Sequence, residues 1–228
     1  MEGPASRRRA RGDRARALKA LRDSAFSADT ALDKDDYELK SVNLDGSWAV
    51  VACLTRKRDG RELVLKAMKC NYRDGDFETR FASEVAFQQR AAEQNLAPPI
   101  LQYGWGSSAF FDAAGIRSAL RPFGESGTGM LYILMEQWTS TLREWWNSAS
   151  VDDKATVRAL TYALYDQIAG LGLRLDDLSA DNVMVRSKPT LRVCAIDFDP
   201  NMTLEDQGAQ EVMRGGVELV FEALDLCR

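Results

Sequence analysis

The sequence predicts an α+β fold with a β-rich first part and a mostly helical second part. Three short runs of apolar and β-branched residues lie between residues 39 and 68. The last two flank Lys57-Arg58-Asp59-Gly60, and an Asp-Gly pair supplies the positive φ angles of a hairpin turn. The second half carries apolar residues at helical spacing instead. Strands followed by helices indicate separate β and α regions rather than alternating βα units.

Hydrophobic spacing and breaker residues define the elements of the first part. Residues 77–95 contain no Gly or Pro, repeat apolar residues at helical spacing, and stop before Pro98-Pro99. The segment 104–129 is rich in Gly, Ser and Ala and is expected to be irregular. The other expected elements are strands over 39–44, 48–54, 62–68, 100–103 and 130–135.

The second part is expected to be helical around one small hairpin. Apolar residues at helical spacing predict the helices, and Gly170 and Gly172 end the one over 152–171. The expected elements are helices over 139–148, 152–171 and 204–226, and two short strands on either side of residues 187–190.

Composition excludes several kinds of chemistry. The chain has no histidine, which excludes a Ser-His-Asp triad and a Cys-His pair. Its four cysteines have no metal-ligand spacing and are expected to be reduced, mostly buried thiols. No apolar run has the roughly 18 residues that a membrane span needs, so no membrane association is expected. Any reaction must therefore depend on carboxylates, amides, lysine and a bound cofactor.

The first 36 residues are expected to be a basic, disordered arm. Residues 1–22 hold eight Lys and Arg against two acidic residues, although the whole chain has a net charge of −4. A solvated arm is the favoured interpretation; a nuclear-localisation signal, an anionic-surface contact or a transit peptide are the alternatives. The expected location is the cytoplasm, with a nuclear location left open by the arm, and nucleic acid is not an expected partner.

An acidic motif near the end of the chain carries the functional signal. Asp177 precedes Asn182 by five residues, a strand follows, and Asp197 ends the next apolar strand in Ile196-Asp197-Phe198. This pattern resembles the catalytic and metal-binding loops of the protein-kinase-like superfamily. The resemblance covers about residues 37–200. It implies a bilobal fold that binds ATP and Mg²⁺ in the cleft between its lobes, with an N-lobe at 37–136 and a truncated helical C-lobe at 137–228.

The resemblance also implies a role for each motif residue. Asp177 would orient the attacking hydroxyl, and Asn182 and Asp197 would bind the metal ion. Lys66 lies in a mostly apolar strand, where an unpaired ammonium is unfavourable, and its expected partner is Glu84 of the following helix. In the family this pair holds the α- and β-phosphates.

Two further segments would contact the nucleotide. Gly46 and Ser47 correspond to the glycine-rich loop, and Val51 to the valine that packs on the base, but Leu44 and Ala49 replace the first and third glycines. Fewer glycines imply a looser phosphate cradle. The hinge between lobes would be Met135, Glu136 and Trp138, whose backbone groups would bind the adenine edge. Trp145 and Trp146 are expected in the core.

Departures from the family pattern narrow the prediction. The histidine that usually stands two residues before the catalytic Asp is Leu175, the usual arginine is Asp176, and the lysine typical of Ser/Thr kinases is Ser179. Asp199 replaces the glycine of the metal loop, and no Ala-Pro-Glu motif follows it. The chain therefore looks closer to small-molecule kinases of the aminoglycoside-phosphotransferase type, or to atypical kinases, than to a regulated protein kinase.

The resulting expectation is a phosphotransferase that moves the γ-phosphoryl of ATP to a hydroxyl on a small molecule or protein. The acceptor and the oligomeric state are not indicated by the sequence. One alternative is a pseudokinase that binds nucleotide or partners without turnover, which the depleted glycine loop and Leu175 favour. The other alternative is an unrelated α+β interaction protein, in which Lys66 and Glu84 would not meet.

Overall fold

The computed structural model describes the chain in nine segments, and each statement below concerns them. They are residues 12–20, 23, 36–43, 49–68, 77–113, 130–173, 175, 177–198 and 209–226. The chain divides into two compact units with separate hydrophobic cores. The sheet unit comprises residues 11–85 and 100–137, and the helical unit comprises residues 1–10, 86–99 and 138–228. Residues 86–99, predicted within the N-lobe, therefore group with the helical unit instead.

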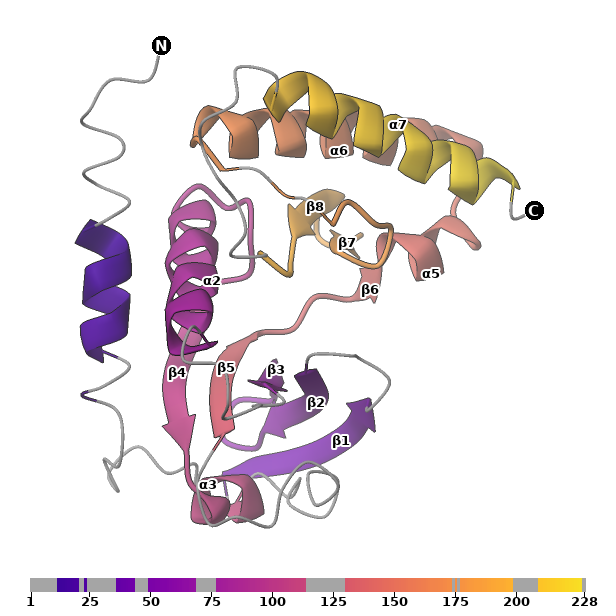
Figure 1. Cartoon of the computed structure of the whole chain (residues 1–228). Coiled ribbons are helices and arrows are strands. Elements are labelled where there is room, and N and C mark those ends of the chain that lie inside the picture. The colour runs from indigo at the N-terminus through magenta and orange to yellow at the C-terminus, as the bar shows by residue number, and fades with distance from the viewer. Residues whose placement is uncertain are drawn as a thin grey trace. The chain divides into compact units, whose positions relative to one another are not determined.

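The sheet unit is built on one five-stranded antiparallel sheet (Figure 1). Its strand order is β1-β2-β3-β5-β4, so β5 lies between β3 and β4. The turn between β2 and β3 adopts the predicted hairpin, with Gly60 at a φ of 68°. The strands are β1 (Tyr37–Asn43), β2 (Ala49–Arg56), β3 (Arg61–Met68), β4 (Ile100–Gly106) and β5 (Met130–Glu136).

One face of this sheet forms the core of the unit together with the short helix α3 (Ser108–Ala113). Phe110 and Phe111 of α3 pack there with Tyr132, and the Phe110 and Tyr132 rings lie 4.1 Å apart. A methyl group at Gly106 would come within 2.8 Å of both phenylalanine rings, so this position requires glycine. The prediction of an irregular segment from residue 104 is therefore wrong for β4 and α3; residues 114–129 lie outside the described residues.

Helix α2 (Phe77–Ala92) follows the sheet's first three strands in the chain. It ends three residues earlier than predicted, because Asn95 adopts a positive φ of 60°. A residue in the left-handed conformation ends a helix by redirecting the chain, and Asn tolerates it better than most residues. The amide of Leu96 then donates to the carbonyl of Ala91.

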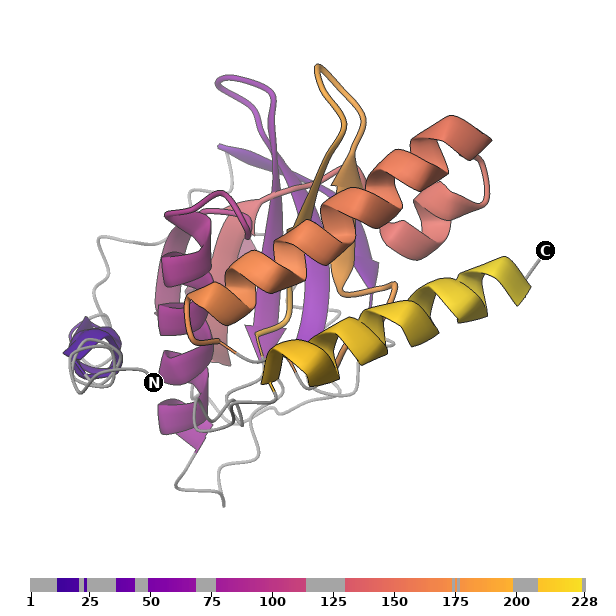
Figure 2. The same cartoon turned by 90° about the horizontal axis from the view of Figure 1, so that it is seen from above.

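Among its described residues from 138 onward, the helical unit has two long helices, a short helix and a small sheet. Figure 2 shows α6 and α7 side by side. Ser150 caps α6 by accepting a hydrogen bond from the amide of Asp153, and Thr141 and Glu144 form a capping box on α5. The elements are β6 (Ser140–Thr141), α5 (Leu142–Trp146), α6 (Val151–Gly170), β7 (Val183–Arg186), β8 (Arg192–Ala195) and α7 (Ala209–Leu226).

The structure differs from some predictions for this unit and for the arm and agrees with others. Ser140 and Thr141 pair with β7, so the predicted helix over 139–148 begins later, at Leu142. Trp146 is 2% exposed and packs on Phe221, as expected for a core residue. Residues 12–20 of the predicted disordered arm are helical. Within the described segments, no helix combines the length and apolarity required to span a membrane.

Candidate functional site

The β7–β8 hairpin brings the two predicted metal ligands together. Val183 pairs with Ala195 at the open end of this hairpin. The next residues outward are Asn182 and Ile196, and the amide of Ile196 donates to the carbonyl of Asn182 at 2.9 Å. Asn182 and Asp197 therefore leave the same end of the same hairpin. Distant positions in the sequence meet here because the strand register fixes them.

Asp177 is joined to this end of the hairpin through Asn182. The side-chain amide of Asn182 donates to both the carbonyl oxygen and the Oδ2 of Asp177, each at 3.1 Å. Because the Nδ2 of Asn182 faces Asp177, the Oδ1 of Asn182 points away from the Asp177 carboxylate. Leu175 is 5% exposed and its amide donates to the sulfur of Met213. Leu175 is therefore packed in the core of the helical unit.

Asp197 has an unusual backbone conformation. Its φ is 63°, in the left-handed region that non-glycine residues seldom adopt. The following Phe198 is completely buried and holds the chain in place, while Asp197 itself is exposed. Such strain, of order 1–3 kcal/mol, concentrates at functional sites. An exposed carboxylate at the end of a buried strand suits a ligand-binding role.

The donor set at the hairpin fits a hard cation. Among the described residues, no group of three or more His, Cys, Asp or Glu side chains is placed to hold a metal ion. The segments at this end of the hairpin carry the carboxylates of Asp177 and Asp197 and the amide of Asn182. Mg²⁺ commonly uses one or two protein carboxylates and takes its other oxygens from phosphates and water, so this set suits magnesium bound with a phosphate ligand.

In the sheet unit, Lys66 and Glu84 form the predicted ion pair. The Nζ of Lys66 lies 2.7 Å from the Oε1 of Glu84, and their side chains are only 14% and 8% exposed. Val51 and Ile133 flank Lys66 on the neighbouring strands, so the three side chains share one face of the sheet. The ammonium therefore stands on the face opposite the Phe110–Tyr132 core.

The other residues predicted to contact the nucleotide lie in the nucleotide loop and in the predicted hinge. Gly46 and Ser47 lie outside the described residues. Met135 is 7% exposed, and the carboxylate of Glu136 lies 3.5 Å from the guanidinium of Arg61. Trp138 begins the helical part of the chain, and the guanidinium of Arg186 stacks 4.6 Å from its ring. The predicted hinge thus coincides with the point where the chain leaves the sheet unit.

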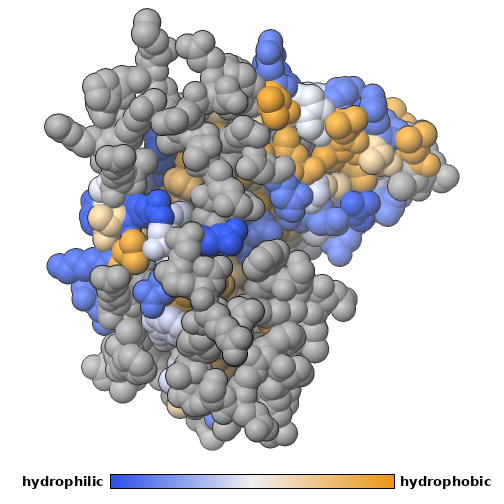
Figure 3. All heavy atoms as spheres, in the orientation of Figure 1, coloured by the Kyte–Doolittle hydropathy of each residue, from blue (hydrophilic) through white to orange (hydrophobic). Residues whose placement is uncertain are grey.

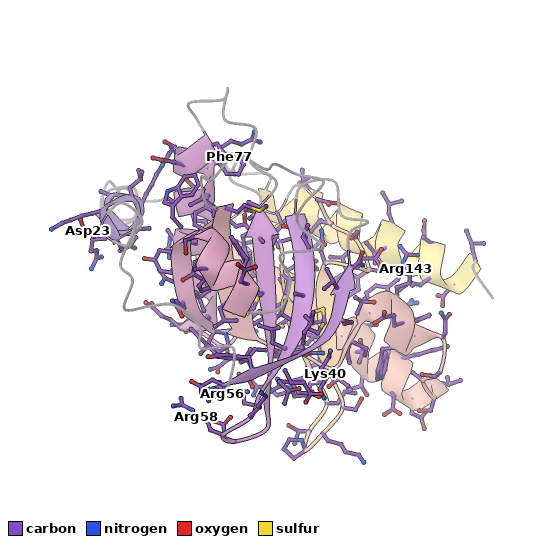
Figure 4. All side chains as sticks on the ribbon, turned by 90° about the horizontal axis from the view of Figure 1, so that it is seen from below. Asp23, Lys40, Arg56, Arg58, Phe77 and Arg143 are labelled. Carbon is purple, nitrogen blue, oxygen red and sulfur yellow. The ribbon has the colours of Figure 1, made fainter. Side chains whose placement is uncertain are left out.

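A cavity of about 420 Å³ opens beside Asp177, entirely within the helical unit. It lies between the loop that carries Asp177 and α7, with Arg143 of α5 at one side; Figure 4 shows Arg143 next to α7. The Nε of Arg143 also donates to the carboxylate of Asp181. The sequence does not predict this cavity, since nothing in a linear pattern places α7 against the Asp177 loop.

Tyr165 of α6 is another feature near Asp177 that the sequence does not predict. It is 3% exposed and lies close enough to Asp177 for the two groups to interact electrostatically. Burial, and secondly the negative charge of Asp177, raise the pKa of the Tyr165 phenol. The phenol therefore stays neutral, and it forms part of the packed support behind the Asp177 loop.

No protein-family model matches this sequence, and no curated protein matches it at a significant level.

Proposed function

We propose that this chain is a phosphotransferase that uses ATP and Mg²⁺ to phosphorylate a hydroxyl group. The observation that carries the proposal is the arrangement at the β7–β8 hairpin, where Asn182 contacts Asp177 and its backbone is bonded to that of Ile196, the residue before Asp197. The buried Lys66–Glu84 pair supports it from the sheet unit.

Each residue has a distinct task in the proposed reaction. The carboxylate of Asp177 would accept a hydrogen bond from the acceptor hydroxyl and orient its oxygen. Asn182 and Asp197 would supply oxygen ligands to Mg²⁺, which neutralises phosphate charge when bound. The ammonium of Lys66, held in place by Glu84, would contact phosphate oxygens. The rate enhancement would come from positioning and electrostatics, without a covalent protein intermediate.

Thermal unfolding in the presence of nucleotide tests the proposal. A ligand at 100 times its Kd stabilises the folded state by about 2.7 kcal/mol, which raises the Tm of a chain of this size by about 5–10 °C. The wild-type chain is expected to show this shift with ATP and Mg²⁺ together, and a much smaller one with ATP and EDTA. ATP turnover should accompany it and should be lost in Asp197→Ala.

Asp166→Ala is the matched control. This carboxylate also lies in the helical unit, in an exposed ion pair with Arg214, and its removal is expected to cost less than about 1 kcal/mol. It should leave the magnesium-dependent shift intact. Equal shifts in Asp197→Ala and wild type, or no shift at any magnesium concentration, would refute the proposal.

A pseudokinase is the second candidate, and the Leu175 position favours it. A buried leucine replaces the family histidine, and the sequence retains one glycine of three in the nucleotide loop. This candidate predicts a nucleotide-dependent shift in Tm without release of ADP. Measuring ADP production beside the unfolding experiment therefore separates the two candidates.

A further inference from the structure

Helix α7 carries two adjacent apolar lines rather than one. The first is buried, and the second is the α7 stripe, defined as Val212, Gly216, Leu219, Ala223 and Leu226. Steps of four and three residues keep these positions on one helix face. Three of the five belong to the large apolar residues that the described segments leave exposed: Val212 at 54%, Leu219 at 66% and Leu226 at 84%. Figure 3 shows apolar side chains gathered along α7.

The α7 stripe is not needed to attach α7 to α6. Met213, Val217 and Phe221 are at most 1% exposed and form the buried line of the helix. Polar pairs add to this attachment on the α6 side. They are Arg214 with Asp166, Arg158 with Asp225, and Tyr162 with Glu218. An isolated exposed leucine is ordinary, but a continuous exposed apolar line on one helix indicates a binding surface.

The α7 stripe forms one wall of the cavity that contains Asp177. Its first four members line the cavity, and the opposite wall includes Leu175 and Leu178. Leu178 lies so close to Gly216 that a methyl group there would overlap its side chain. Glycine at this position therefore lets the two walls approach. The cavity volume falls within the range that small-molecule sites occupy.

The polar groups of the cavity are concentrated at the Asp177 loop. Of the described residues that line it, all but Arg143, Asp177 and Ser179 are apolar or glycine. The lining holds one carboxylate, that of Asp177, and one guanidinium, that of Arg143, which is paired with Asp181 outside the lining. A polycationic acceptor would need several carboxylates, and a bare sugar would leave the apolar walls without contacts. The lining favours an acceptor with one polar end and an apolar body.

We infer that the acceptor is an amphiphilic alcohol, bound with its hydroxyl at Asp177 and its apolar body along the part of the α7 stripe that lines the cavity, from Val212 to Ala223. This inference rests on the proposed phosphotransferase function. In the transfer, the alcohol oxygen forms a bond to the γ-phosphorus of ATP, and the bond from that phosphorus to the bridging oxygen of ADP breaks. ADP leaves with the electron pair, and the hydroxyl proton passes to Asp177 and then to solvent.

Binding of simple alkanols tests the inference without nucleotide. Butan-1-ol, hexan-1-ol and octan-1-ol are titrated into the full chain carrying ¹³C-labelled Leu and Val methyl groups, and NMR spectra are recorded. The methyl signals of Leu178, Val212 and Leu219 are expected to shift. Affinity should rise about fourfold for each added CH₂ group, because each transfers more apolar surface from water.

Two matched substitutions on α7 locate the site. Leu219→Asp puts a charge into the cavity wall and should reduce octan-1-ol affinity at least tenfold. Leu226→Asp makes the same change on the same helix at a more exposed residue outside the cavity lining, and it should leave affinity within twofold of wild type. Both positions are exposed, so circular dichroism and Tm should match the wild type.

The outcomes separate this inference from the proposed function. Absence of chain-length dependence, or equal effects of Leu219→Asp and Leu226→Asp, overturns the amphiphile site even when ATP and Mg²⁺ bind. A dimer that both substitutions dissociate, seen by light scattering, also overturns it and identifies the stripe as a contact between copies. Alkanol binding without any nucleotide-dependent Tm shift overturns the phosphotransferase function and the acceptor role together. Octyl phosphate, detected by mass spectrometry, supports both.

Discussion

Removing one member of the Lys66–Glu84 pair should destabilise the protein more than removing both. In Glu84→Met, the ammonium of Lys66 loses the carboxylate oxygen that lies 2.7 Å away, while the Lys66 side chain remains only 14% exposed. In Lys66→Met, the carboxylate of Glu84 is left at 8% exposure. Methionine has similar length to either side chain and carries no charge, so each substitution removes the charge with little change in volume.

The magnitude follows from burial. Breaking a buried ion pair costs about 3–5 kcal/mol, because the remaining charge stays desolvated after the opposite charge is removed. The residual exposure of Lys66 places Glu84→Met near 3 kcal/mol, or about 6–12 °C in Tm for a chain of this length. Replacing both partners removes both charges, so the free energy of unfolding of the double variant should lie within about 1 kcal/mol of the wild-type value.

Urea denaturation followed by tryptophan fluorescence and circular dichroism measures all four members of this double-mutant cycle. Agreement between the two probes checks that a single transition is observed. The stable double variant should also fail to bind ATP with Mg²⁺, since the proposed phosphate contact is absent. Additive losses in the double variant, or single variants that lose less than about 1 kcal/mol, would refute the reasoning from a buried, coupled pair.

Three further predictions follow from individual residues. Asp197→Gly relieves the backbone strain of the positive φ of 63° and should raise the free energy of unfolding, measured in urea, by about 1 kcal/mol. It should also remove the magnesium-dependent Tm shift. A lower free energy of unfolding would contradict the inference of strain at Asp197. Phe221→Ala empties a fully buried position beside Trp146 and should cost about 3–5 kcal/mol in the same assay, in contrast to Glu222→Ala on the exposed side. Burial raises the pKa of Tyr132 from its usual value of 10.0 to about 12. Below pH 10 its contribution to stability is complete, and it falls as pH rises through 12; urea midpoints at pH 9 and 11.5 should show this drop in wild type, and a smaller one in Tyr132→Phe.

The secondary structure was largely predictable because local signals agree with one another. The Asp59-Gly60 turn, the apolar strands and the Pro98-Pro99 stop each act within a few residues, and the structure has strands and a helix at these places. The order of the sheet was not predictable, since the pairing of β3 with β5 joins segments more than 60 residues apart. Helix α3 was missed because its composition resembles a loop and two buried phenylalanines stabilise it.

The candidate site was predictable to the extent that chain spacing determines it. Asn182 reaches Asp177 because only five residues separate them, and the β7–β8 hairpin places Asp197 at the end that carries Asn182. Lys66 meets Glu84 because strand and helix follow one another. The residues next to Asp197 in the sequence do not predict its left-handed conformation. The cavity depends on how α7 packs beside a distant loop, which periodicity in α7 alone does not specify.

The tip of the β7–β8 hairpin offers a place to attach a reporter. Lys188, Pro189 and Thr190 are exposed and lie beyond the last strand pair, Arg186 with Arg192, at the opposite end from Asn182. Extra residues at the tip would lengthen only the connection, whereas one residue added inside either strand would slip the register and reverse which side chains face inward. A fluorophore or epitope inserted there would label the protein without changing the geometry around Asp197.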